Sequence, residues 1–411
     1  MNLASFLADR IYANRESRFS GLVIRISLGA TIISVAVMII TVALAEGFQQ
    51  RISEKVFSFW GHIRIQEKQP GKAIIAEEIP IRHNEALLQL LRQQPGVRSV
   101  YPFATRYALL KTKENMEGVM LKGLGDNKQL EQLSSFLQDG RVPQLPDSGF
   151  SREILVSRHT ANRLQLQPND TLLLYFVREG SLPTARKMCV SGIYKTGIED
   201  YDNLFAIGDI ELIRQLNQWE QDQVGGYELL LNDPRTMDTT AQSLYALAAF
   251  PATWDAISVK EVSPQLFDWL QMQDLTRNVL IGFMTVVAII NLICCLLILV
   301  LERVRMIGLL KAMGATDWFV QRIFLRYGLL ITIRGVLIGT ALALLLLWWQ
   351  DKTGFIRLDE AAYFVDKAAV KIIPWQVFAI AAGTIISSFL MLLIPSWLVK
   401  KISPVQSIRF T

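Results

Sequence analysis

The sequence contains 411 residues, of which 51% are hydrophobic, and its mean hydropathy of +0.29 is high for a water-soluble protein. The net charge is +5 and the pI is about 9.0, and the chain contains only three histidines and three cysteines. This composition indicates a membrane protein and excludes a disulfide-stapled scaffold.

Four apolar runs of about twenty residues are each long enough to cross about 30 Å of hydrocarbon as a helix. They occupy residues 26–45, 279–301, 327–349 and 375–398. Arg334 is the one charge inside them, and its long stem can reach toward the near interface. A buried core helix is the alternative for any single run. The first run could also be a signal peptide, because Ala43, Leu44 and Ala45 resemble a cleavage site, but its 25-residue leader is too long and favours an uncleaved span.

The basic residues predict which side of the membrane each segment occupies. Residues 1–25, 302–326 and 399–411 together hold twelve basic and four acidic residues, whereas the loop 350–374 is neutral and residues 46–278 carry a net charge of −4. By the positive-inside rule, both termini and the loop 302–326 are cytoplasmic. The basic pI therefore reflects topology and does not indicate a nucleic-acid partner.

Residues 46–278 are predicted to form a mixed α/β domain outside the cytoplasm. Alternation predicts strands, and apolar residues at helical spacing predict helices. The predicted strands are 62–67, 107–112, 119–123, 171–177, 188–194 and 227–231, and the predicted helices are 84–94, 157–164, 210–219 and 239–249. We expect the first span to continue as a helix through residues 46–59, and a helix over 255–277 to lead into the second span.

The sequence contains no catalytic constellation and no metal-binding cluster. His62, His83 and His159 are far apart, and no Gly-x-Ser-x-Gly occurs. A P-loop is also missing, because Gly71-Lys72 lacks the required upstream glycine. We therefore expect no catalytic residue, no metal and no directly bound cofactor. A membrane-anchored enzyme remains a poor alternative.

The loop after the second span carries the most specific motif. It reads Glu302-Arg-Val-Arg-Met-Ile-Gly-Leu-Leu-Lys-Ala-Met-Gly-Ala-Thr316, which resembles the signature of the FtsX/MacB/Lol permease superfamily of ABC transporters, although Met306 replaces a usually acidic residue. The resemblance implies a cytoplasmic coupling helix that docks on a separate ATPase. The coupling residues that it implies are Glu302, Arg303, Arg305, Ile307, Gly308, Leu310, Lys311 and Gly314.

The residues of this segment suit a docking role on their own account. Met306, Leu309, Leu310 and Met313 fall at helical spacing and predict one apolar stripe, with Arg303, Arg305 and Lys311 available to acidic groups, and Gly314 is expected to end the helix. An amphipathic helix on anionic lipid is the alternative.

Further blocks resemble the Lol lipoprotein-release permeases, the LolC/LolE family. They are Phe6 to Arg15, Gly47-Phe48, Gly192 to Asp202, Ala288 to Asn291 and Pro395 to Pro404. Asn291 needs a hydrogen-bond partner within the membrane, and helix-to-helix pairing would supply it. Gly192, Gly197, Tyr201 and Asp202 could be purely structural. Arg334 departs from the uncharged family pattern.

The resemblance implies a multi-pass protein of the bacterial inner membrane, with a cytoplasmic N-terminal amphipathic helix (1–25) and its large domain in the periplasm. Its expected partners are two copies of a P-loop ATPase that binds ATP and Mg²⁺, a second permease chain, a lipoprotein substrate, membrane lipid and a periplasmic lipoprotein carrier. In this family a hairpin loop hooks the carrier, and residues 178–186 match it, with Gly180, Leu182 and Pro183 at the tip. A plain turn would use the same residues. The alternative functions are a MacB-like exporter and an FtsX-like mechanotransmitter that regulates periplasmic hydrolases.

Overall fold

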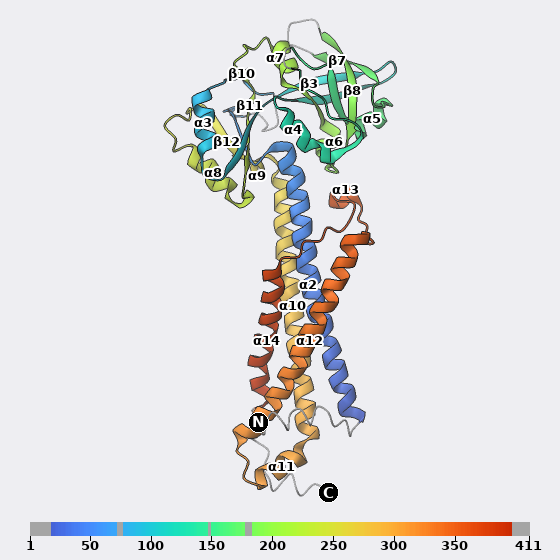
Figure 1. Cartoon of the computed structure of the whole chain (residues 1–411), viewed down its shortest axis with the longest axis vertical. Coiled ribbons are helices and arrows are strands. Elements are labelled where there is room, and N and C mark those ends of the chain that lie inside the picture. The colour runs from blue at the N-terminus through green and yellow to red at the C-terminus, as the bar shows by residue number, and fades with distance from the viewer. Residues whose placement is uncertain (1–17, 72–76, 147–148, 177–182, 397–411) are drawn as a thin grey trace. The chain divides into compact units, whose positions relative to one another are not determined.

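The structure is a computed structural model, which describes residues 18–71, 77–146, 149–176 and 183–396 (Figure 1). The described residues form two compact units. The helical unit comprises those within residues 1–50, 269–357 and 367–411, and the sheet domain comprises those within 51–268 together with 358–366. Most of the predicted N-terminal helix 1–25 and all of the tail 399–411 lie outside the described residues; residues 18–25 begin the first long helix.

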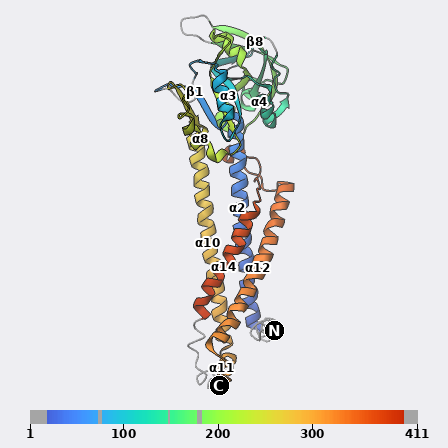
Figure 2. The same cartoon turned by 60° about the vertical axis from the view of Figure 1, so that its left-hand side comes forward.

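Among the described residues, four helices are long and apolar enough to cross a membrane (Figure 1 and Figure 2). They are α2 (Arg18–Trp60), α10 (Pro264–Glu302), α12 (Asp317–Thr353) and α14 (Pro374–Ser396). Three of them contain a whole predicted span, and the fourth contains residues 375–396 of the span predicted over 375–398, whose last two residues lie outside the described ones. At about 1.5 Å per residue, the 43 residues of α2 and the 39 residues of α10 are longer than a bilayer core is thick. The predicted continuation of the first span through residue 59 is confirmed.

Small residues bring α12 into close contact with α2. A Cβ atom added at Gly339 would lie 2.7 Å from the backbone oxygen of Ile32, and one added at Gly335 would lie 2.7 Å from Cγ2 of Thr31. Ala343, one turn further along, is fully buried. This glycine, glycine, alanine series at spacing four is the pattern by which helices approach closely in membranes.

Polar side chains tie three of these helices together next to the ends of their apolar runs. Glu46 of α2 accepts hydrogen bonds from Arg277 of α10 at 3.2 Å and from Gln376 of α14 at 2.9 Å. Arg277 also lies 3.0 Å from Asp274, which accepts a hydrogen bond from Gln49 at 3.2 Å. The helices of this unit are thus held together by polar contacts next to the ends of their apolar runs and by apolar contacts along the runs.

The sheet domain is built on a ten-stranded sheet that closes a ring through six strands. The ring follows the pairings β3–β4–β9–β6–β8–β7–β3. The other pairings are β12–β1–β11–β3 on one side and β5 on β8 (Figure 1). The 15-residue strand β3 belongs to both parts, because its first half pairs with β11 and its second half with β4 and β7.

The bounds of the strands are β1 (Ile63–Glu67), β2 (Ile81–Arg82), β3 (Val97–Lys111), β4 (Met116–Leu124), β5 (Leu137–Gly140), β6 (Glu153–Ser157), β7 (Thr171–Phe176), β8 (Thr184–Tyr194), β9 (Phe205–Asp209), β10 (Gln223–Val224), β11 (Gly226–Leu231) and β12 (Trp254–Ser258). The helices of this domain are α3 (Glu85–Gln93), α4 (Asn127–Gln132), η1 (Leu133–Phe136), α5 (Arg158–Leu164), α6 (Glu199–Leu204), α7 (Ile210–Asn217), η2 (Pro234–Thr236), α8 (Met237–Leu244), α9 (Val259–Val262) and α13 (Glu360–Tyr363).

A mixed α/β domain is therefore confirmed, but several predicted elements differ from the structure. The helix predicted over 255–277 is wrong in its first part, because residues 254–258 form β12, which pairs antiparallel with β1, and α10 begins only at Pro264, a residue suited to a first helical turn. The helix predicted over 239–249 ends at Leu244. The strand predicted over 107–112 is only the last part of β3, whose first half pairs with β11.

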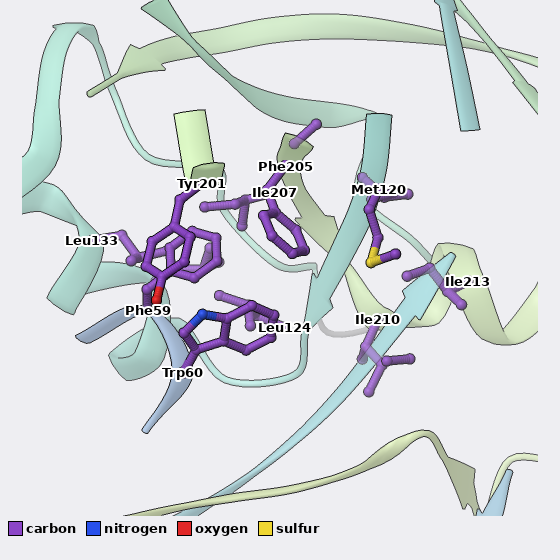
Figure 3. Close-up of a cluster of buried hydrophobic side chains, with 14 of the residues drawn as sticks. Phe59, Trp60, Met120, Leu124, Leu133, Tyr201, Phe205, Ile207, Ile210 and Ile213 are labelled. Carbon is purple, nitrogen blue, oxygen red and sulfur yellow. The ribbon is translucent and has the colours of Figure 1, made fainter. Parts of the chain in front are cut away.

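The end of α2 lies inside the core of the sheet domain. Figure 3 shows the rings of Phe59 and Trp60 among buried side chains of β4, β9 and α7, and both residues are at most 2% exposed. The Lys122 ammonium group donates hydrogen bonds to the Phe59 backbone oxygen and, at 2.6 Å, to the Glu228 carboxylate. Burial lowers the pKa of Lys122, and the charge of Glu228 opposes that shift. A buried cation thus holds the last turn of α2.

A second buried ion pair lies nearby, between Arg64 of β1 and Glu78. The Glu78 carboxylate also accepts hydrogen bonds from the backbone nitrogen of Thr105 at 2.7 Å and from its hydroxyl at 2.8 Å. Burial raises the pKa of Glu78, and the charge of Arg64 opposes that shift. The two pairs place four charges within the interior of one domain, each next to an opposite charge.

We expect Lys122→Met to lower the free energy of unfolding by about 3–5 kcal/mol, because it leaves the Glu228 carboxylate buried without its cation. The measurement is chemical unfolding of the full-length protein in detergent, followed by tryptophan fluorescence. The double variant Lys122→Met, Glu228→Gln is the control, and it should recover most of the loss because no buried charge stays unpaired. Equal losses in both variants would contradict this account.

Candidate coupling site

The segment with the most specific motif forms a helical hairpin. Helix α11 (Val304–Ala312) follows α10 after one residue, and α12 begins at Asp317. Gly314 adopts a positive φ of +93°, and the next residue, Ala315, donates its N–H to the Leu310 oxygen at 3.0 Å. The hydroxyl of Thr316 caps α12 by accepting from the Phe319 nitrogen. The predicted helix end at Gly314 is therefore confirmed.

The apolar residues of α11 point in two directions. Ile307 and Gly308 are buried, and Ile307 belongs to a cluster with Val320 and Phe324 of α12. Met306 and Leu310 pack against the same cluster. The remaining surface, which we call the outer face, consists of Arg305, Leu309, Ala312 and Met313. Leu309 is 58% exposed and Met313 is 69% exposed.

The predicted apolar stripe is therefore only partly exposed, because Met306 and Leu310 pack against the cluster whereas Leu309 and Met313 are exposed. The stripe is divided because α10 and α12 cover one side of α11, a contact that helical spacing alone does not reveal. Lys311 also differs from the prediction, since its side chain is only 9% exposed and its ammonium group lies 2.9 Å from Asp317. This ion pair closes the hairpin, so Lys311 is not offered to a partner.

The other predicted charges of this segment are distributed unevenly. Glu302 and Arg305 are exposed, and Arg303 is half-buried. The hairpin also exposes Trp318, at 58%, in the first turn of α12. Trp318 was not predicted, although a tryptophan in the first turn of a helix and outside an apolar run suits a surface contact, because tryptophan is enriched among the residues that dominate protein interfaces. The exposed part of the hairpin thus combines Leu309, Met313 and Trp318 with charged residues of both signs.

The two predicted intramembrane polar residues lie on different helices. Asn291 of α10 donates hydrogen bonds to Ser27 of α2, at 3.1 Å to the backbone oxygen and 3.3 Å to the hydroxyl. Such a bond between helices satisfies an amide in hydrocarbon. Arg334 lies on α12, next to Gly335, and its side chain is exposed.

The predicted carrier loop lies only partly within the described residues. Strands β7 and β8 form an antiparallel hairpin in which Phe176 lies opposite Thr184, so β8 begins four residues earlier than predicted and includes residues 184–186 of the predicted loop 178–186. Gly180 and Leu182 lie outside the described residues, and Pro183 is exposed.

Strand β7 and its neighbours β3 and β4 expose large apolar side chains on one face of the sheet. Tyr107 and Leu109 of β3, Met116 of β4 and Leu173 of β7 are between 36% and 57% exposed. Lys111 lies opposite both Met116 and Leu173, and strand alternation puts all five residues on the same side of the sheet. We call these five residues the hairpin face. A patch of this kind on a domain surface is typical of a protein contact.

The block Gly192 to Asp202 covers the end of β8, a tight turn and the first residues of α6. The Asp202 carboxylate accepts hydrogen bonds from the Thr196 nitrogen at 2.9 Å, the Thr196 hydroxyl at 2.8 Å and the Gly197 nitrogen at 3.0 Å. The Tyr201 hydroxyl lies 2.9 Å from the hydroxyl of Ser263, and burial raises the pKa of Tyr201 to about 12. These contacts give the motif a structural role.

Within the ranges that the structure describes, no three His, Cys, Asp or Glu side chains lie close enough together to hold a metal ion. The described surface carries two apolar patches, the outer face of α11 and the hairpin face.

Two family models match the sequence. The MacB-like periplasmic core domain matches residues 26–247, and the FtsX-like permease C-terminal domain matches residues 278–404.

Curated relatives match over nearly the full length. The lipoprotein-releasing system transmembrane protein LolC of Xylella fastidiosa (strain 9a5c) is 22% identical over 97% of this chain and 96% of its own length. The corresponding LolE of Haemophilus influenzae (strain ATCC 51907 / DSM 11121 / KW20 / Rd) is 23% identical over 99% of both chains.

Among solved structures, the periplasmic region of MacB from Actinobacillus actinomycetemcomitans matches with a TM-score of 0.34 and 11% identity, covering 50% of this chain and 91% of that one. The extracellular domain of the ABC-type transporter YknZ from Gram-positive bacteria matches with a TM-score of 0.32 and 15% identity, covering 48% and 99%.

Proposed function

We propose that this chain, which belongs to the family of the MacB-like periplasmic core domain, is a permease subunit of an ABC transporter that releases lipoproteins from the bacterial inner membrane. The observation that carries the proposal is the likeness to relatives named for lipoprotein release, which spans at least 97% of this chain and so includes both units. The exporter and mechanotransmitter alternatives are not favoured, because these end-to-end relatives are named for neither activity.

The proposed assembly contains two copies of a P-loop ATPase, which bind ATP and Mg²⁺, and a second permease chain, the same or homologous. A lipoprotein would enter sideways from the bilayer and would leave to a periplasmic carrier. Extraction of acyl chains costs about 0.8 kcal/mol per methylene, which explains the need for ATP. The permease itself would contribute no catalytic residue.

The hairpin of α11 suits the contact with the ATPase. Its inner side is fixed to α10 and α12 by Ile307 and by the ion pair between Lys311 and Asp317. Its outer face presents Leu309 and Met313. A push on the outer face would therefore reach both long helices without first unfolding the hairpin. Substitution of the buried Gly308 would test the fold of the hairpin instead of its docking.

We expect the hairpin to be cytoplasmic and the sheet domain to be periplasmic, because the basic residues favour that orientation. The test uses a chain in which all three cysteines are replaced and one cysteine is introduced, at either Asp317 or Glu131, both of which are exposed. In intact spheroplasts, a membrane-impermeant thiol reagent should label position 131 and not position 317. Permeabilised cells are the control, in which both should react; labelling of position 317 in intact cells would contradict the topology.

We expect Leu309→Asp combined with Met313→Asp to lower co-purification of the ATPase about tenfold or more, because two charges would enter the centre of the docking surface. Membrane yield should not change, since both side chains are already exposed. The matched control is Leu90→Asp, which changes an exposed leucine of α3. Unchanged co-purification would instead favour a helix lying on lipid.

We expect Leu109→Asp combined with Leu173→Asp to reduce ATP-dependent cross-linking of the periplasmic carrier about tenfold, because the hairpin face would lose its apolar centre. Ile79→Asp, at another exposed apolar position of the sheet domain, is the control. Undiminished cross-linking of the carrier to the double variant would mean that the carrier binds another surface or that the protein works without a carrier.

A further inference from the structure

The connection between α12 and α14 contains a segment that belongs to the sheet domain. Residues 358–366, which include α13, fall in that domain, whereas the chain on both sides of them falls in the helical unit. The segment is closed on itself, because the Leu358 nitrogen donates to the Asp366 oxygen at 3.0 Å. We call residues 358–366 the strap.

Glu360 fastens the strap to two lysines of the sheet domain. Its carboxylate accepts a hydrogen bond from Lys195, and one of its oxygens lies 3.9 Å from the Lys55 ammonium group at the end of α2. Lys55 also donates to the Phe364 backbone oxygen at 2.7 Å. The ring of Phe364 packs against the core of the domain. The strap therefore has ionic, hydrogen-bonded and apolar attachments.

Gly197 makes room for the Glu360 carboxylate. A Cβ atom at position 197 would collide with the carboxylate oxygen of Glu360 and would lie 2.9 Å from Nζ of Lys55. Gly197 also has a positive φ of +75°, which Asp202 holds through its hydrogen bond to the Gly197 nitrogen. The tight loop 195–202 is thus shaped to receive the strap.

Loop 195–202 also contacts the chain at the end of α2 and at the start of α10. The Tyr201 ring is stacked on Phe59 of α2 at 5.0 Å between ring centroids, and Figure 3 shows Tyr201 next to Phe59 and Trp60. The Tyr201 hydroxyl pairs with Ser263, the residue directly before α10. One loop of eight residues therefore contacts the strap, the end of α2 and the residue before α10.

We propose that the strap is a fastener, held by Glu360 on Lys55 and Lys195, that links the connection between α12 and α14 to loop 195–202, the loop that also contacts the end of α2 and the residue before α10. A movement of α12 and α14 would then pull on the same residues that hold α2 and α10. The existence of the fastener does not depend on the proposed function. Its use in an ATP-driven stroke does rest on that function.

The test is hydrogen exchange of the full-length chain alone in detergent micelles, read for backbone amides of residues 358–366. Glu360→Gln removes the charge, and Gly197→Ala displaces the carboxylate without removing any charge. We expect either change to speed exchange in the strap roughly three- to tenfold, as expected for the loss of partly exposed ion pairs. Exchange of the buried strands should stay the same.

Two matched controls separate the fastener from general damage. Gly96→Ala introduces a side chain at a similar positive φ of +88° with no neighbour within 4 Å, and Glu199→Gln removes an exposed carboxylate three residues from the motif's Thr196. Neither should change exchange in the strap. The double reversal Lys195→Glu, Glu360→Lys should restore part of the protection that Lys195→Glu alone removes.

Unchanged exchange in the Glu360→Gln and Gly197→Ala variants, or equal loss in the single and double reversals, would overturn the proposal. Because these measurements use the chain without ATPase or substrate, they report the protection of the strap amides whether or not an ATPase binds the chain. A protected strap in a chain that fails to bind an ATPase would reject the proposed function and leave the fastener in place.

Discussion

The hydrogen bond from the Lys122 ammonium group to the Phe59 oxygen satisfies a backbone group at the buried end of α2, on which the attachment of that helix to the sheet domain depends. Helix α2 runs without a break from its apolar stretch to Trp60, in the core of a domain that must also be stable in water. A helix that ends in an apolar core leaves backbone oxygens without partners, and a cation suits the negative end of the helix dipole. Glu228 balances the buried charge, which would otherwise cost several kcal/mol.

Next to that contact, strand β3 joins the two parts of the sheet, namely the β12–β1–β11 strands and the six-strand ring. Strand β3 pairs with β11 on one side and closes the six-strand ring through β7 on the other. Lys122 lies on β4 and Glu228 on β11, two strands that pair with β3 on opposite sides, so the ion pair crosses the shared strand. A force on the end of α2 is therefore shared by both parts of the sheet and is not absorbed by one hairpin.

The sequence predicts what depends on local patterns. The four spans, the end of the coupling helix at Gly314, and helices α5 and α7 follow from apolar spacing and capping residues. Strands β6 and β9 were not predicted, because both are almost wholly buried and lack alternation. The faces of α11 were not predicted either: spacing shows that apolar residues share a helix, but the neighbours that cover Ile307 and leave Leu309 exposed come from other helices.

The attachments of the long helices to the sheet domain differ in burial, and this difference has a mechanical consequence. The side chains of Lys122 and Glu228 are each 2% exposed, whereas those of Lys55, Glu360 and Lys195 are between 19% and 35% exposed. Partly exposed ion pairs are weak and open with little free energy, and moving elements are drawn from the least stable parts of a fold. The strap's attachment therefore costs less free energy to open than that of α2, so it transmits a pull only up to the strength of its ion pairs and opens before the end of α2 is displaced.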